Sequence, residues 1–309
     1  MVTFIIRRLL GIFTTLVLLS LFTFALSRTV PGGPWLQGAE IPQSPAQIAA
    51  FKAKYGLDKP VWEQYLIWLG NALTLDFGVP FSSPEVTVTQ QIRRLLPYSA
   101  LVGGLAALLA VGLGVTLGML AAARQHSWLD NTVNLYAVVI GTVPSFVMGF
   151  LLVYIFAAKL HWFPSGGWSS WRNLVLPVVA FGLPATGGVA LWTRQCMAEA
   201  MSADYVRTAY AKGLRDRGVM LRHVLRNALI PMVTAFLPLF PGMMTGSIFI
   251  EQVFGLPGLG KVFVLSSTNR DYPMVLGITM FWALLISGTY LVTDILYGVI
   301  DPRVRLRGK

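Results

Sequence analysis

Cysteine, histidine and charged side chains are all scarce in this sequence of 309 residues. A lone cysteine, Cys196, excludes an intramolecular disulfide and leaves no cysteine-based metal site. The three histidines, His126, His161 and His223, fall in different predicted loops, and no HExxH pattern occurs. The sequence therefore predicts neither a metal site nor a catalytic constellation.

Charge is too sparse for a soluble domain of this length. Only 12% of the residues are charged, whereas 55% are hydrophobic, and the mean hydropathy is +0.65. This composition predicts an integral membrane protein. The net charge of +11 would suit a nucleic-acid partner, but most lysines and arginines fall on one side of the topology given below. The positive-inside rule accounts for that asymmetry, so no nucleic-acid role is assigned.

Apolar runs predict an all-α protein with six transmembrane helices and both termini in the cytoplasm. The first run is longer than a signal-peptide core and lacks an Ala-x-Ala site, which favours an uncleaved span. The predicted domains are a cytoplasmic stub with the first helix (1–28), an external cap (29–96) with amphipathic helices near 45–55 and 60–75, and a core (97–309). The expected spans are 9–26, 98–123, 131–158, 173–193, 229–250 and 273–300.

Acidic residues are nearly absent from these spans, and Asp294 is the clear exception. A proton- or sodium-driven carrier usually needs acidic groups near the middle of the membrane, so transport driven from elsewhere is favoured. Asp294 is expected either to pair with a neighbouring helix or to reach the cytoplasmic interface.

One segment matches part of the consensus sequence of a phosphate-binding loop. Residues 255–261, GLPGLGK, fit G-x-x-x-x-G-K, but Val262 stands where a magnesium-binding Ser or Thr is needed. The loop contains Pro257 and lies outside by the predicted topology. Gly255, Pro257, Gly258 and Gly260 are therefore interpreted as an external Gly/Pro-rich loop.

The most basic segment lies between the fourth and fifth spans. It carries seven lysines and arginines between Arg194 and Arg226. The pattern predicts two short helices: the first is capped by Ser202 or Asp204 and has an apolar face of Val206, Tyr210 and Leu214. Residues 216–218 are expected to form the turn. Charge alone is equally compatible with a plain positive-inside loop.

Motifs along the whole chain resemble the peptide/nickel branch of binding-protein-dependent ABC importer permeases. The resemblance is strongest in the run 205–214, YVRTAYAKGL, and in 222–231, RHVLRNALIP, which together look like the EAA loop (195–228) of that family. The short loop HWFPSGGW at 161–168 is more similar to the oligopeptide than to the dipeptide permeases. Further matches are 4–9, 31–34, 55–60, 64–65, 76–78, 144–146, 254–260, 270–273 and 301–303.

The resemblance implies the fold of a type I ABC importer permease in the bacterial inner membrane. It implies a second homologous permease, two cytoplasmic ATPases that bind ATP and magnesium, and an external peptide-binding protein, with no cofactor on this chain. The residues implied to contact an ATPase are Tyr205, Arg207, Thr208, Ala209, Lys212, Gly213 and Leu214. Because a broken helix and adaptable methionines suit a peptide path, the predicted translocation residues are Pro144, Ser145, Met243, Met244 and Thr245.

Three positions depart from the family pattern. Arg207-Thr208 replaces Glu-Ala of the general motif, Pro231 comes later after Gly213, and Gly33 replaces an acidic residue.

The substrate stays open among oligopeptides, dipeptides, nickel, glutathione and other small solutes. Two functions of other classes also stay open: an ATP-independent secondary carrier, and a membrane receptor or scaffold.

Overall fold

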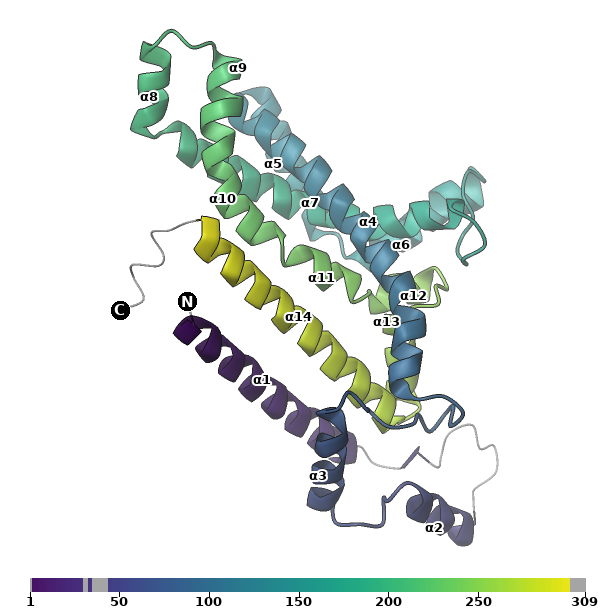
Figure 1. Cartoon of the computed structure of the whole chain (residues 1–309). Coiled ribbons are helices and arrows are strands. Elements are labelled where there is room, and N and C mark those ends of the chain that lie inside the picture. The colour runs from purple at the N-terminus through teal and green to yellow at the C-terminus, as the bar shows by residue number, and fades with distance from the viewer. Residues whose placement is uncertain (1, 30–32, 35–43, 301–309) are drawn as a thin grey trace. The chain divides into compact units, whose positions relative to one another are not determined.

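The computed structural model describes residues 2–29, 33–34 and 44–300, and these residues form helices without any strand (Figure 1). Five helices are long and apolar enough to cross a membrane, and counting a sharply bent pair of helices as one span gives six. The all-helical class is confirmed, and each predicted span overlaps one of these helices or the bent pair. The predicted motifs at 31–32 and 301–303, and the basic tail, lie outside the described residues.

Two compact units make up the chain. Unit 1 combines residues 1–97 with 258–287, whereas the predicted core had kept the latter segment with residues 98–257. Unit 1 contains α1 (Val2–Thr29), α2 (Pro45–Lys54), α3 (Val61–Ala72), the start of α4 (Val88–Ala123), α13 (Leu259–Thr268) and the first half of α14 (Tyr272–Ile300). The helices α2 and α3 lie at the positions of the two helices predicted for the cap.

The loop before α4 is tied to the start of α14 inside unit 1. The carboxylate of Asp271, which is fully buried, accepts hydrogen bonds from the backbone N–H groups of Phe81 (3.0 Å) and Ser82 (2.9 Å) and from the Ser82 hydroxyl (2.6 Å). A Cβ at Gly277 would lie 2.4 Å from a methyl of Val88, so glycine is needed there. The apolar core of the unit forms around these bonds.

Unit 2 carries the remaining helices. These are the rest of α4, then α5 (Trp128–Thr142), α6 (Ser145–Leu152), the π-helix η2 (Val153–Lys159), α7 (Arg172–Met201), α8 (Asp204–Ala211), α9 (Asp216–Gly218), the π-helix η3 (Val219–Val224), α10 (Leu225–Phe236), α11 (Leu239–Met244) and α12 (Ile248–Val253). The end of α14 also belongs to this unit.

Small residues let α4, α5 and α7 pack with their backbones close together. A Cβ at Gly118 of α4 would lie 2.4 Å from the Ala190 carbonyl oxygen of α7, and one at Gly187 would lie 2.4 Å from the Ala137 carbonyl oxygen of α5. Such approaches are available only to glycine, and they supply van der Waals contact where the hydrophobic effect is weak.

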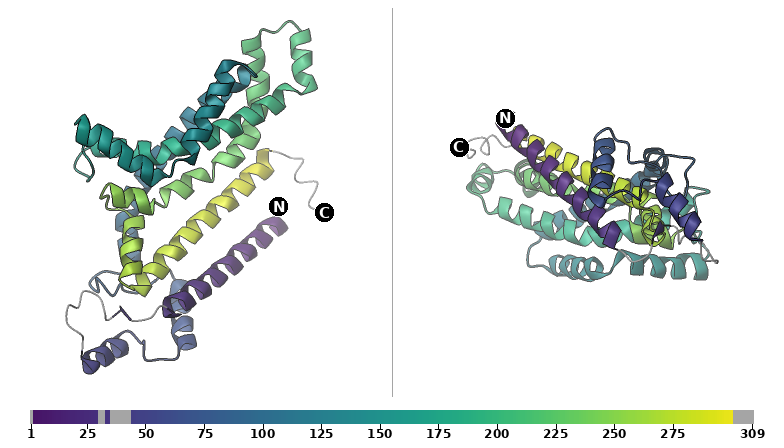
Figure 2. Two further views of the ribbon diagram at one scale, coloured as in Figure 1. Left: turned by 180° about the vertical axis from the view of Figure 1, so that it is seen from behind. Right: turned by 90° about the horizontal axis from the view of Figure 1, so that it is seen from below.

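The third span is broken. Helices α5 and α6 diverge by 95° at Val143–Pro144, so α6 and η2 leave the line of α5 as a separate arm (Figure 2). Pro144 cannot donate a backbone hydrogen bond and disfavours helical geometry at the residue before it. The bend at Pro144 is therefore much sharper than an ordinary proline kink.

Three boundaries differ from the predictions. Helix α4 begins at Val88 and not near Tyr98, α7 continues to Met201, and the helix of the fifth span begins at Asp216 and not near Leu229. Hydropathy finds the apolar centre of a span, whereas a helix continues into the polar interface for as long as its backbone bonds are made.

Candidate functional site

The basic segment folds as a helical hairpin of α8 and α9–η3, drawn at one end of unit 2 in Figure 1. Its inner face is formed by Val206 and Ala209, which are 4% exposed, and they belong to one core with Val219 and Val224. The predicted two-helix form is confirmed, and the predicted apolar face is right at Val206 but wrong at Tyr210 and Leu214. Tyr210 and Leu214 are each 43% exposed, and Ala209 is buried beside Val206 instead.

The predicted cap and turn of this hairpin are also wrong. Ala203 occupies the N-cap position, and the Ser202 hydroxyl donates instead to the Glu199 carbonyl at 2.8 Å. The turn lies at 212–215, and residues 216–218 already begin the second helix. Asp216 then supplies a negative charge at the N-terminus of that helix, where the helix dipole favours it.

Gly213 ends α8 in a left-handed conformation, with φ of +77°. The Gly213 N–H donates to the Tyr210 carbonyl (2.9 Å) and the Leu214 N–H donates to the Ala209 carbonyl (3.3 Å). This pair of bonds is the Schellman ending, which favours glycine. A Cβ at Gly213 would meet no atom within 4 Å, so within this chain the glycine is needed for its backbone angle.

Six of the seven residues predicted to contact an ATPase lie exposed on the hairpin, and Ala209 is buried within it. The exposed group is Tyr205, Arg207, Thr208, Lys212, Gly213 and Leu214. The Arg207 side chain is 83% exposed, with Asp204 at 3.9 Å as a loose neighbour. Desolvation and the nearby Asp216 carboxylate raise the pKa of Tyr210, so this side chain is a neutral hydrogen-bonding group at physiological pH. The hairpin thus presents a polar and aromatic surface with an excess of positive charge.

The second helix of the hairpin runs without a break into the fifth span. Its buried side chains are Val219, Val224, Ala228, Met232 and Phe236, spaced by five residues once and then by four. A spacing of five matches the π turn η3, and a spacing of four matches the α-helix that follows. One apolar stripe therefore joins the hairpin to the membrane-spanning part.

The five predicted translocation residues do not form one surface. Pro144 is exposed at the bend and Ser145 begins α6, whereas Met243 (5% exposed) and Thr245 (7%) are buried. The Met243 backbone lies directly against Gly103. Their role in a path stays a prediction. A cavity of about 580 Å³ lies near the bend and is lined by residues that the motif analysis did not single out, among them Thr142, Pro184, Gly188 and Leu239.

Two buried carboxylates were missed by the analysis of the sequence. Asp130 of α5 forms a bidentate ion pair with Arg194 of α7, at 2.5 and 2.7 Å, and its side chain is 2% exposed. Glu251 of α12, also 2% exposed, accepts a hydrogen bond from Ser99 of α4 at 2.6 Å. The residues of each pair are far apart in sequence, so a single sequence contains no signal that joins them.

The predicted external loop leads into α13. Gly255 has φ of +61°, Gly258 is the N-cap residue of α13, and Gly260 is buried in its first turn. The helix α12 precedes the loop, whereas a phosphate-binding loop follows a strand. This context supports the rejection of a nucleotide site.

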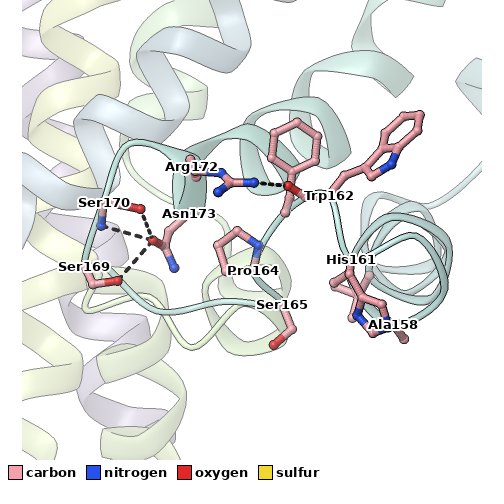
Figure 3. Close-up of a pocket in the computed structure, with 12 residues that line it drawn as sticks. Ala158, His161, Trp162, Pro164, Ser165, Ser169, Ser170, Arg172 and Asn173 are labelled. Atoms are coloured by element: carbon pink, nitrogen blue, oxygen red, sulfur yellow. Dashed lines mark hydrogen bonds between the residues drawn. The ribbon is translucent and has the colours of Figure 1, made fainter.

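The aromatic loop after η2 borders an open pocket of about 610 Å³ that has both polar and apolar walls (Figure 3). The Asn173 amide oxygen accepts hydrogen bonds from Ser169 and Ser170, and Arg172 donates to the Trp162 carbonyl at 2.5 Å. The Gly167 N–H donates to the Phe254 carbonyl at 2.8 Å. This last bond joins two loops that the sequence analysis had treated separately.

Comparison with known proteins gives relatives along the whole chain. The oligopeptide transport system permease protein OppB of Escherichia coli (strain K12) is 40% identical over 307 residues, which are 99% of this chain and 100% of that protein. OppB of Salmonella typhimurium is 39% identical with the same coverage. The dipeptide transport system permease protein DppB of Bacillus subtilis (strain 168) is 35% identical over 309 residues, 100% of both chains.

A solved structure and two family models agree with these relatives. A crystal structure of an amino acid ABC transporter with histidines superposes with a TM-score of 0.54 at 18% identity, covering 70% of this chain and 94% of that one, which supports the fold alone. Residues 1–81 match the N-terminal model of the membrane components of binding-protein-dependent transport systems. Residues 114–306 match the model of their inner membrane component, and the chain belongs to this family of ABC transporter permeases.

Proposed function

We infer that the chain is the permease subunit through which an ATP-driven, binding-protein-dependent importer takes up peptides. The observation that carries this proposal is the exposed hairpin of α8 and α9–η3, which continues into a membrane-spanning helix in a chain related over its full length to peptide permeases. A continuous helix is suited to carry a movement from the hairpin into the membrane.

The proposal assigns this chain no ATPase activity of its own. Two partner ATPases bind ATP and magnesium, and one of them grips the exposed face of α8 through Tyr205, Arg207 and Lys212. A second, homologous permease completes the path, and an external protein delivers the peptide. The basic hairpin faces the cytoplasm by the positive-inside rule, which places both termini on that side.

Reconstitution tests the function class and the substrate together. The complex, co-expressed with its ATPases and its second permease, is placed in proteoliposomes, and uptake of labelled tripeptides to pentapeptides, dipeptides, Ni²⁺ and glutathione is compared. Peptide uptake that needs ATP and the binding protein is the expected result. Uptake without any ATPase would show a secondary carrier, uptake of only nickel or glutathione would change the substrate, and no flux at all would favour a receptor or scaffold.

The first prediction concerns the end of α8. Gly213→Val is expected to reduce peptide uptake by about tenfold or more, because a β-branched residue is strained at φ of +77° by at least about 1–2 kcal/mol. The C-terminal end of α8 must then rearrange, which displaces the exposed residues that are proposed to contact an ATPase. Uptake per assembled complex and ATP hydrolysis are measured together, and hydrolysis is expected to persist without uptake.

Gly213→Asn is the matched control, since asparagine adopts left-handed geometry more readily than other residues with a side chain. This variant is expected to keep most of the uptake. Normal uptake by the valine variant would contradict a role of this helix end in coupling. Loss of uptake in both variants would show that the empty space beside Gly213 is filled by a partner, so that lack of a side chain is what matters.

A further inference from the structure

An open groove of about 440 Å³ lies on the second helix of the hairpin, where that helix becomes the fifth span. Its walls are Leu221, Arg222, Leu225, Arg226 and Leu229, which come from η3 and the start of α10. This is the helix that Figure 1 labels α9 and then α10. All five residues belong to unit 2, so the groove does not depend on how the two units are placed.

Three leucines form an exposed apolar row in the groove. They are Leu221, Leu225 and Leu229, spaced by four residues, so they follow one side of the helix. Leu221 is 55% exposed and Leu229 is 41% exposed, and Val233, four residues further on, is 40% exposed. The row therefore leads from the hairpin into the apolar part of the fifth span. Such a row is suited to contact with an acyl chain.

Two arginines flank this row. Arg222 and Arg226 are both exposed, and neither has a hydrogen-bond or ion-pair partner among the residues that the structure describes. Side chains one turn apart on a helix begin about 5–6 Å from each other, so the two guanidinium groups can bind one phosphate together. No Asp or Glu lines the groove in the described part of the chain. The groove thus favours an anion.

The distance of the arginines from the apolar part of the span indicates the source of that anion. The predicted fifth span begins near Leu229, and Arg226 and Arg222 lie three and seven residues before it. These separations are about 4.5 and 10 Å along the helix axis. The headgroup layer extends about 5–8 Å beyond the hydrocarbon core on each side. Arg226 therefore lies in that layer, and the long side chain of Arg222 can reach it.

A tryptophan supports this level independently. Trp128, at the start of α5, is 75% exposed, and tryptophan is enriched where a membrane meets water. It lies two residues before Asp130, which is paired with Arg194 of α7. Three residues further along α7, Met197 belongs to the same core as Val224 of the groove helix. The start of α5 and the groove are therefore near the same interface.

We propose that this groove binds an anionic phospholipid. Its phosphate accepts hydrogen bonds from Arg222 and Arg226, and one acyl chain lies along Leu225 and Leu229. Because the groove has two cations and no carboxylate, it offers nothing to the ammonium group of a zwitterionic headgroup. The proposal rests on the placement of the fifth span in a membrane and not on the solute that the importer carries.

The test maps lipid contacts on the intact complex of both permeases and both ATPases. The complex is placed in phosphatidylcholine vesicles that contain a trace of phosphatidylglycerol with a photoactivatable acyl chain, or the same probe on phosphatidylcholine. After irradiation, labelled peptides are identified by mass spectrometry. Residues 219–233 are expected to be labelled several-fold more by the anionic probe, and added salt is expected to reduce that difference.

Removal of the arginines is expected to remove this preference. Arg222→Gln and Arg226→Gln are each expected to lower labelling of residues 219–233 by the anionic probe about fivefold, and the double variant about thirtyfold. The matched control is the double variant Arg215→Gln, Arg217→Gln, which removes the same charge from exposed positions of the same hairpin outside the groove. It is expected to lower labelling by less than about twofold. Equal labelling of the unchanged chain and the groove variant, or equal losses in the two double variants, would overturn the proposal.

The number of ATPase subunits in the purified complex separates a lipid from a protein partner. The variant that lacks both groove arginines is expected to retain as many ATPases as the unchanged chain. Loss of ATPases from this variant, or no labelling of residues 219–233 by either probe in the unchanged complex, would assign the groove to another chain. Equal labelling by the two probes would show a surface that contacts lipid without selecting a headgroup. Each of these three outcomes would overturn the proposal.

Discussion

Asp130→Asn is expected to lower the free energy of unfolding by about 3 kcal/mol, a larger loss than that of any surface charge. Asp130 holds the Arg194 guanidinium through two hydrogen bonds and also accepts bonds from the His126 N–H (2.9 Å) and the Asn134 amide (3.0 Å). The variant leaves a partly buried cation facing a neutral amide. Because the Arg194 side chain is 27% exposed, water limits the penalty to the lower end of the range for broken buried pairs.

Cys196 provides the measurement. It is the only cysteine in the sequence and its side chain is buried, so a thiol-reactive dye labels it when α7 opens. The labelling midpoint of Asp130→Asn is expected to fall by about 6–12 °C. Lys59→Gln, which removes an exposed ion pair of 2.7 Å, is the control and is expected to shift it by less than about 2 °C.

The double variant Asp130→Asn, Arg194→Gln distinguishes a broken pair from a general disturbance. Two neutral amides can bond to each other, so the double variant is expected to be more stable than the sum of the two single changes predicts. Strict additivity would contradict the view that the two side chains act as a pair.

Gly103→Ala is expected to destabilise unit 2 by about 3 kcal/mol, although it adds a single methyl group. That Cβ would lie 2.0 Å from the carbonyl oxygen of Met243, and the obstacle is backbone, so α4 and α11 must separate. The cost is at the upper end of that for overpacking a core. The labelling midpoint of Cys196 is again the measurement, with uptake as a second one.

Gly112→Ala in the same helix is the control. A Cβ at Gly112 meets nothing within 4 Å, and alanine is the better helix former by about 1 kcal/mol, so a neutral or slightly stabilising effect is expected. Equal effects of the two alanines would mean that close packing of α4 against α11 does not contribute to stability.

Local patterns predicted the helical class, the six spans, the amphipathic pair α2 and α3, and the hairpin of α8 and α9. Apolar runs and short amphipathic segments depend only on residues close together in the sequence, so a single sequence is enough to find them. The apolar face of α8 was predicted correctly at Val206 and wrongly at Tyr210, because Ala209 is the residue that packs beside Val206 in the core.

Contacts between residues that are far apart in the sequence could not be predicted from such local patterns. Asp130 with Arg194 and Ser99 with Glu251 join residues separated by 64 and 152 positions, and nothing near either partner marks the other. Met243 and Thr245 were chosen for the path by residue type, yet both are buried, and the Met243 backbone lies directly against Gly103 of α4. Residue type suggests which side chains could line a path, but the packing of the helices determines which of those side chains are exposed.

The π turn η3 lies inside the interval between Gly213 and Pro231, which is longer in this chain than in the general family motif. A π turn holds about one residue more than an α turn. An added residue in a regular α-helix would rotate everything after it by about 100°, turning Met232 and Phe236 away from the core. When the added residue lies in the π turn η3, the chain becomes longer, but the side chains that follow keep their orientation about the helix axis. Two permeases with hairpins of unequal length can thus present the same helical face to the membrane.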